Sequence, residues 1–123
     1  MPDWLAVLLG GGAGALARYA VGHWASARFP DALLAFPWHT FGINVLGSFA
    51  LGLVVVWCKE RPTWLYFLGT GVCGGFTTFS TFSYQLVTLL EKDRPAAAAA
   101  YAGGSVAAGL LGAVLAVRLA RGA

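Results

Sequence analysis

Charge is scarce in this sequence: only 11% of its 123 residues are charged, whereas 59% are hydrophobic and the mean hydropathy is +0.72. An ordinary soluble domain has about 25% charged residues, so the composition argues against one. The acids are absent from the interiors of the apolar runs and lie near run ends: Asp3, Asp31, Glu60, Glu91 and Asp93. The net charge of +3 comes from residues that flank these runs, which is typical of membrane proteins and gives no sign of nucleic-acid binding.

Cysteine and histidine are also rare, with two of each in the chain. Cys58 and Cys73 have no third thiol and no metal-ligand spacing, so we interpret them as reduced residues that fill space. His23 and His39 lie near the ends of apolar runs without acidic partners. No nucleophile, base and acid form a catalytic set, and we therefore expect no enzymatic activity.

Long apolar runs are what the chain does contain, and about twenty residues are enough for a helix to cross a bilayer. Strand-like alternation is absent, so helices are the expected form of these segments. The sequence predicts an all-α, multi-pass membrane protein, with one four-helix domain over residues 1–123 and spans at 4–24, 37–57, 63–90 and 95–117. The first run is similar to a signal peptide, but Asp3 replaces the basic start of one, so we expect a retained span.

The basic residues do not indicate an orientation in the membrane. Four predicted spans place both termini on one side, and the charges on that side are Lys59, Arg61, Arg118 and Arg121. The opposite side has Arg28, Lys92 and Arg94, and Arg18 can snorkel to join them. Orientation normally follows an excess of Lys and Arg in cytoplasmic loops. This balance leaves two alternatives open: insertion in both orientations with antiparallel pairing, or one orientation set by weaker signals.

Small residues recur at helical spacing in three of the predicted spans. Gly10 and Gly14 form a GxxxG motif in the first span, Ser48 and Gly52 repeat the spacing in the second, and Ser105 and Gly109 repeat it in the fourth. Such positions let helix backbones approach closely in lipid. Four helices of this length enclose little space by themselves, so we expect the chain to form an oligomer.

Two polar residues lie inside predicted spans. Asn44 is near the middle of the second, where an amide needs a hydrogen-bond partner. Bonding to another helix is the commoner role for such an amide, and lining a polar pathway is the alternative. Arg18 is the only charge well inside a span. It is placed equally well for an anion vestibule and for an anchor at the membrane interface.

The segment GVCGGFTTFSTF at 71–82 is the most unusual part of the chain. Its glycines predict a break in the third span, and a break frees backbone groups that lipid cannot satisfy. Free carbonyls suit a small cation, whereas free N–H groups and hydroxyls suit an anion. Phe79 and Phe82 follow at helical spacing, with Ser80 and Thr81 between them. The positive edges of two such rings can attract an anion without a full charge.

Together these features resemble the CrcB/Fluc family of fluoride channels. The resemblance covers nearly the whole chain: GGGAGALARY in the first span, TFGINVLGSFALG in the second, GVCGGFTTFSTFS in the third, and Tyr101 with Ser105 in the fourth. It implies a dual-topology antiparallel homodimer in the cell's inner (plasma) membrane that exports fluoride and so relieves its toxicity. It also implies two fluoride pores and a central Na⁺.

The resemblance assigns roles to individual positions. The implied fluoride pore residues are Asn44, Phe79, Ser80, Thr81, Phe82, Tyr101 and Ser105. Arg18 matches the first-helix arginine of the vestibule, and the main-chain carbonyls of Gly74 and Thr77 match the sodium ligands. Two positions depart from the family pattern: His39 replaces a glycine before the pore asparagine, and Gly109 stands where some relatives have serine.

The pore residues favour passive flow of the ion. Fluoride is tightly hydrated, so a pore that dehydrates it needs several hydrogen-bond donors without a strongly binding charge. No carboxylate lies within a span to couple transport to protons. A small multidrug-type antiporter is the main rival, but such exporters use a first-helix carboxylate, which the interior of this span lacks. A structural subunit that moves no ions is the third hypothesis.

Overall fold

The computed structural model describes residues 1–122, and helices are the only regular elements in that range. Three of them are long and apolar enough to cross a membrane. They are α1 (Asp3–Arg28), α3 (Trp38–Trp57) and α7 (Pro95–Gly122). The remaining elements are α2 (Pro30–Ala35), α4 (Pro62–Trp64), η1 (Leu65–Cys73), α5 (Gly74–Phe76) and α6 (Phe79–Glu91). The expectation of an all-helical, multi-pass membrane protein is confirmed.

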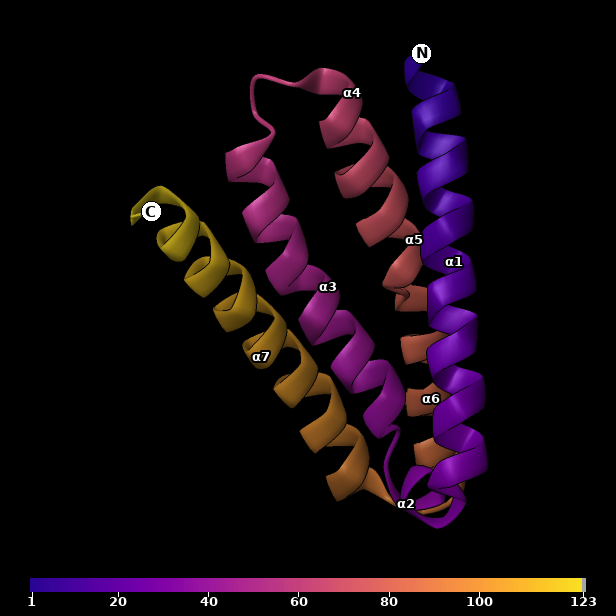
Figure 1. Cartoon of the computed structure of the whole chain (residues 1–123). Coiled ribbons are helices and arrows are strands. Elements are labelled where there is room, and N and C mark those ends of the chain that lie inside the picture. The colour runs from indigo at the N-terminus through magenta and orange to yellow at the C-terminus, as the bar shows by residue number, and fades with distance from the viewer. Residues whose placement is uncertain (123) are drawn as a thin grey trace.

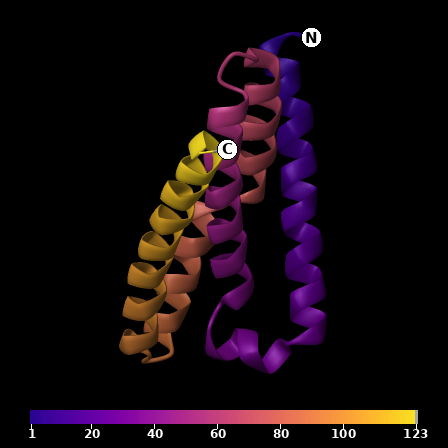
Figure 2. The same cartoon turned by 60° about the vertical axis from the view of Figure 1, so that its left-hand side comes forward.

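The helices form a splayed bundle with the connections at its two ends (Figure 1). Both labelled termini lie toward the end that contains α4 and the α3–α4 connection, whereas α2 and the α6–α7 connection lie at the other end. Helix α3 packs along α7, and α1 packs along η1 and α5. Figure 2 shows α2 joining the lower ends of α1 and α3.

Helix α2 lies between the predicted spans 4–24 and 37–57, where the sequence predicts no helix. Pro30 is instead the first residue of a short helix, where its fixed φ suits the helix and its missing N–H costs nothing. Phe36 follows this helix, and its ring packs against Trp38 and Tyr101 at centroid distances of 4.4 and 5.3 Å. These aromatic contacts hold the α2 end of the bundle closed.

The third apolar run is divided into several elements. A short α-helical turn at α4 leads into the π-helical stretch η1, and α-helix resumes for one turn at α5. Thr77 and Thr78 then have extended backbone, with φ/ψ of −84°/158° and −151°/122°, before α6 begins at Phe79. The helical hydrogen bonds therefore stop at the two threonines that follow the glycine-rich segment. We call Gly75–Thr78 the break segment.

Glycines allow α1 to lie directly on the backbone of this third run. A Cβ added at Gly10 would overlap the carbonyl oxygen of Phe67, and one at Gly14 would overlap that of Val72. On the facing side, a Cβ at Gly75 would overlap the carbonyl oxygen of Gly11. This is the close backbone approach that the GxxxG spacing in the first span predicts.

Candidate functional site

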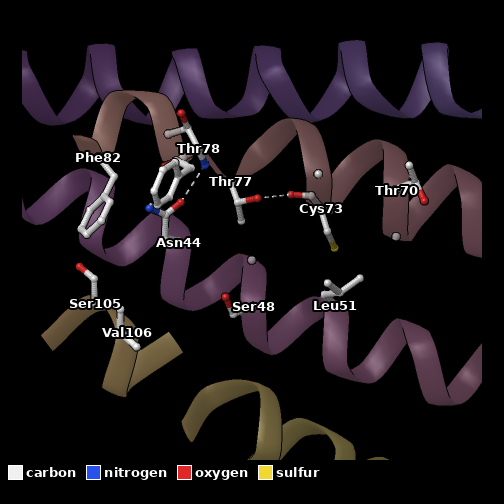
Figure 3. Close-up of a pocket in the computed structure, with 14 residues that line it drawn as sticks. Asn44, Ser48, Leu51, Thr70, Cys73, Thr77, Thr78, Phe82, Ser105 and Val106 are labelled. Carbon is white, nitrogen blue, oxygen red and sulfur yellow. Dashed lines mark hydrogen bonds between the residues drawn. The ribbon is translucent and has the colours of Figure 1, made fainter. Parts of the chain in front are cut away.

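A groove of about 560 Å³ runs along one face of the bundle between α3, η1, the break segment, α6 and α7. Figure 3 shows side chains from these elements converging on it. Its polar lining consists of one amide and several hydroxyls: Asn44, Ser48, Thr70, Thr77, Thr78 and Ser105. Phe79 and Phe82 supply aromatic rings, and no acidic or basic side chain lines the groove within the described residues.

Asn44 holds the backbone of Thr78 through two hydrogen bonds. Its Oδ1 accepts from the Thr78 N–H at 2.8 Å, and its Nδ2 donates to the Thr78 carbonyl at 3.1 Å (Figure 3). The amide therefore satisfies both main-chain groups of an extended residue, which lipid could not do. One hydrogen on Nδ2 remains for another acceptor. Asn44 therefore bonds a segment outside its own helix and also lines the groove.

Thr78 also caps α6. Its Oγ1 accepts from the Thr81 N–H at 3.2 Å, which satisfies one of the donors that a helix N-terminus leaves free. Just before it, Thr77 donates from both its N–H and its Oγ1 to the Cys73 carbonyl, at 3.0 and 2.9 Å. These bonds define where α5 ends and where α6 begins.

Two carbonyls next to the groove lose their helical donors as a result. In a continuous helix the Thr78 N–H would donate to Gly74, but it donates to Asn44 instead. The Thr81 N–H would likewise donate to Thr77, but it donates to Thr78 Oγ1. Gly74 and Thr77, the positions matched to sodium ligands, therefore have carbonyl oxygens without these bonds. No cluster of three or more His, Cys, Asp or Glu able to hold a metal occurs in residues 1–122.

Arg18 reaches the break segment from α1. Its Nε donates to the Gly75 carbonyl at 3.1 Å, and the side chain is half-buried. Arg18 does not line the groove. It approaches the break segment from the α1 side, and the groove lies on the side of α3 and α7.

Phe79 and Phe82 lie at the start of α6 and both line the groove. Their ring centroids are 5.9 Å apart and the rings are tilted by 46°. Phe82 also packs on Tyr101 at 4.9 Å, which fixes its position. Phe79 is 79% exposed, so most of this ring has no neighbour within the chain.

The other predicted pore residues are divided between the groove and its surroundings. Ser105 lines the groove, and its buried Oγ has no hydrogen-bond partner among the described residues. Tyr101 is fully buried beside the groove, and its hydroxyl donates to Gln85 Oε1 at 2.6 Å. Ser80 and Thr81 lie in the first turn of α6 and are not part of the lining.

Thr78, Ser48 and Thr70 belong to the groove but were not selected from the sequence. A signal was available for Thr78, because a threonine just before a helical segment is a preferred N-cap. Ser48 is one helical turn after Asn44, so it shares the face of α3 that the amide identifies. Thr70 has no comparable signal in the sequence.

Comparisons with known proteins agree with these features. The family model described as "CrcB-like protein, Camphor Resistance (CrcB)" matches residues 5–117. The "Fluoride-specific ion channel FluC" of Novosphingobium aromaticivorans is 42% identical over 120 residues, which cover 94% of each chain. The protein of the same name from Methylobacterium nodulans is 46% identical over 91% of this chain and 90% of its own. That from Chloroflexus aurantiacus is 41% identical over 98% of this chain and 97% of its own.

Proposed function

Since the chain belongs to the CrcB family, we infer that it is a fluoride-specific ion channel and not an enzyme. The main support for this inference is the match to curated fluoride channels, which covers nearly the full length of this chain and of each relative. The groove agrees with it, because it offers an amide, hydroxyls and aromatic rings without a charged side chain among the described residues. We propose that fluoride export across the inner (plasma) membrane protects the cell from the ion.

The proposed path of fluoride follows the groove. Asn44 and Ser105 supply donors, and the positive edges of Phe79 and Phe82 attract an anion without holding it too tightly. Ser80, Thr81 and Tyr101 lie next to this lining and complete the proposed set. Since the acids lie only near the ends of the apolar runs, no embedded carboxylate is available for proton coupling, and flow should be passive. The same absence disfavours a multidrug-type antiporter.

We further propose that the segment from α4 to α6 is a fourth crossing, broken at Thr77 and Thr78, and that two copies pair antiparallel. Two observations support this arrangement. The labelled termini lie toward one end of the bundle (Figure 1), as an even number of crossings requires. The groove is open, and the amide and hydroxyls that line it need a cover that lipid does not provide. A second copy would provide it, and the even charge balance permits both orientations.

A structural Na⁺ at the subunit interface is part of the same proposal. The carbonyls of Gly74 and Thr77 have lost the donors that a continuous helix would give them, and Gly74 is exposed at the groove. Oxygen ligands of this kind suit a hard cation. The ion would balance the partial negative charges that these carbonyls bring together from two copies.

Fluoride efflux from liposomes that contain only this protein tests the proposed function. We expect fluoride to leave rapidly and chloride to be retained, with protein-free liposomes as the control. Equal efflux of both anions would refute selectivity, and no efflux of either would favour the structural-subunit hypothesis. For the antiparallel pair, lysines added at one end should abolish activity, and co-expression of an oppositely biased copy should restore it. Full activity from a population with a single orientation would exclude that arrangement.

A further inference from the structure

The carbonyl of Gly75 has lost its helical donor. In a continuous helix this donor would be the N–H of Phe79, but the extended residues Thr77 and Thr78 lie between them. A buried carbonyl without a donor is costly inside a membrane. The Nε of Arg18 takes the place of the missing donor, at 3.1 Å from the carbonyl oxygen.

The packing of α1 brings Arg18 to this carbonyl. A Cβ at Gly75 would overlap the Gly11 carbonyl oxygen, and one at Gly14 would lie 2.8 Å from the Phe76 nitrogen. Helix α1 therefore touches the break segment with its backbone. Arg18 is one helical turn beyond Gly14 on the same face, so its side chain has only a short distance to cover.

We propose that Arg18 is a positioning residue of the channel, which fixes the break segment through the Nε hydrogen bond and not through its charge. The bond fixes the direction of the chain as it leaves α5, and this direction sets where Thr77, Thr78 and Phe79 face the groove. Asn44 holds the same segment from α3 at Thr78. The break segment is thus held from two helices, and loss of the Arg18 bond leaves it attached to α3 alone. A test of this proposal by fluoride flux rests on the proposed function of the chain as a fluoride channel.

Three substitutions separate the hydrogen bond from the charge. Arg18→Gln removes the charge but places its Nε2 donor the same number of bonds from Cα as the Nε of arginine. Arg18→Lys keeps a charge but has a methylene at that position. Arg18→Met has neither the donor nor the charge, with a similar length. Each variant is reconstituted in liposomes, and fluoride efflux is measured over a range of fluoride concentrations and ionic strengths.

We expect Arg18→Gln to retain most of the wild-type maximal flux. Arg18→Met and Arg18→Lys should lose about tenfold, which is the size expected for the loss of one hydrogen bond. The fluoride concentration at half-maximal flux should stay constant in all variants. A vestibule charge would act differently, because it raises the local anion concentration and is screened by salt. Removal of such a charge would shift that concentration and the ionic-strength dependence.

Hydrogen exchange of the backbone amides in residues 76–80 gives a readout that does not depend on flux. Arg18→Gln should exchange like the wild type, and Arg18→Met and Arg18→Lys should exchange faster. Wild-type protein that moved no fluoride would refute the proposed function alone, and the exchange data would still decide the role of Arg18. If Arg18→Met fails to fold, the Gln and Lys variants make the comparison. Wild-type behaviour of Arg18→Lys with loss in Arg18→Gln, or equal behaviour of all variants, would overturn the proposal.

Discussion

Replacement of Asn44 by leucine tests whether its amide holds the break segment in place. Leucine has nearly the same shape but neither donates nor accepts, so the Thr78 N–H and carbonyl both lose their partners at 2.8 and 3.1 Å. Thr78 is extended and has no neighbouring strand, which means that no backbone group replaces the amide. We expect Asn44→Leu to destabilise the fold and to abolish fluoride flux.

Two estimates of the cost of Asn44→Leu differ enough to be distinguished. A buried backbone group left unpaired costs about 1–3 kcal/mol, so two such groups predict a loss of about 2–6 kcal/mol. Hydrogen bonds between membrane helices average only about 0.6 kcal/mol, because the groups find other partners, which predicts about 1 kcal/mol for two. The larger value should apply if the break is held open by Asn44. The smaller should apply if Thr77 and Thr78 can return to a helix.

Reversible unfolding of the purified protein in mixed micelles measures this free energy. Ser48→Ala is the matched control, because Ser48 lies one turn along α3 and lines the same groove. The control should change the free energy of unfolding by less than about 0.5 kcal/mol. If Asn44→Leu costs no more than Ser48→Ala and conducts fluoride normally, the two hydrogen bonds do not hold the break segment, and our reasoning is wrong.

Three further predictions concern other positions. Gly10→Ala should destabilise the protein by about 1–3 kcal/mol, because the new Cβ overlaps a carbonyl oxygen of η1. Gly12→Ala is the control: its Cβ meets nothing within 4 Å, so the free energy of unfolding should stay unchanged in the same assay. Phe79→Ile and Phe82→Ile, each alone, should cost under about 1.5 kcal/mol of stability, because much of the side-chain volume is kept. Both should lose fluoride flux, because the positive ring edges are removed. Wild-type flux in these variants would mean that the two rings only pack the fold. Gly109→Ser should purify and conduct like the wild type, because its Cβ would lie an acceptable 3.6 Å from Ser48 Oγ; loss of the folded protein would contradict this.

The sequence was sufficient to predict the long helices. Apolar length and the absence of acids predicted α1, α3 and α7. The prediction of a break in the third run came from its glycines. Helix α2 was missed because six residues carry too little periodicity to distinguish a short helix from a turn. The extended residues lie at Thr77 and Thr78, after the glycines and not at them. Glycine permits such a change of backbone, whereas capping bonds determine where it occurs.

Within the candidate site, the sequence indicates only those contacts that join residues close to each other along the chain. The Phe79 and Phe82 pair and the cap at Thr78 depend on neighbours in sequence, and both are readable there. The bond from Arg18 to Gly75 joins residues that are 57 positions apart, so no local pattern contains it. The two roles considered for Arg18 from the sequence were a vestibule charge and an interfacial anchor, and neither includes a hydrogen bond to a main-chain carbonyl. Such a bond depends on how closely α1 packs, which the glycines permit but do not specify.

The break segment leaves groups of opposite polarity free on its two sides. On the α5 side, the carbonyls of Gly74 and Thr77 have lost their helical donors to Asn44 and to the cap of α6. On the α6 side, the first N–H groups of a helix have no partners within it, and Thr78 Oγ1 takes only that of Thr81. Carbonyl oxygens attract a cation and helix N-terminal N–H groups attract an anion. One interruption of the backbone would therefore supply acceptors for the proposed cation and, beside the Phe79 ring, donors for the proposed fluoride path.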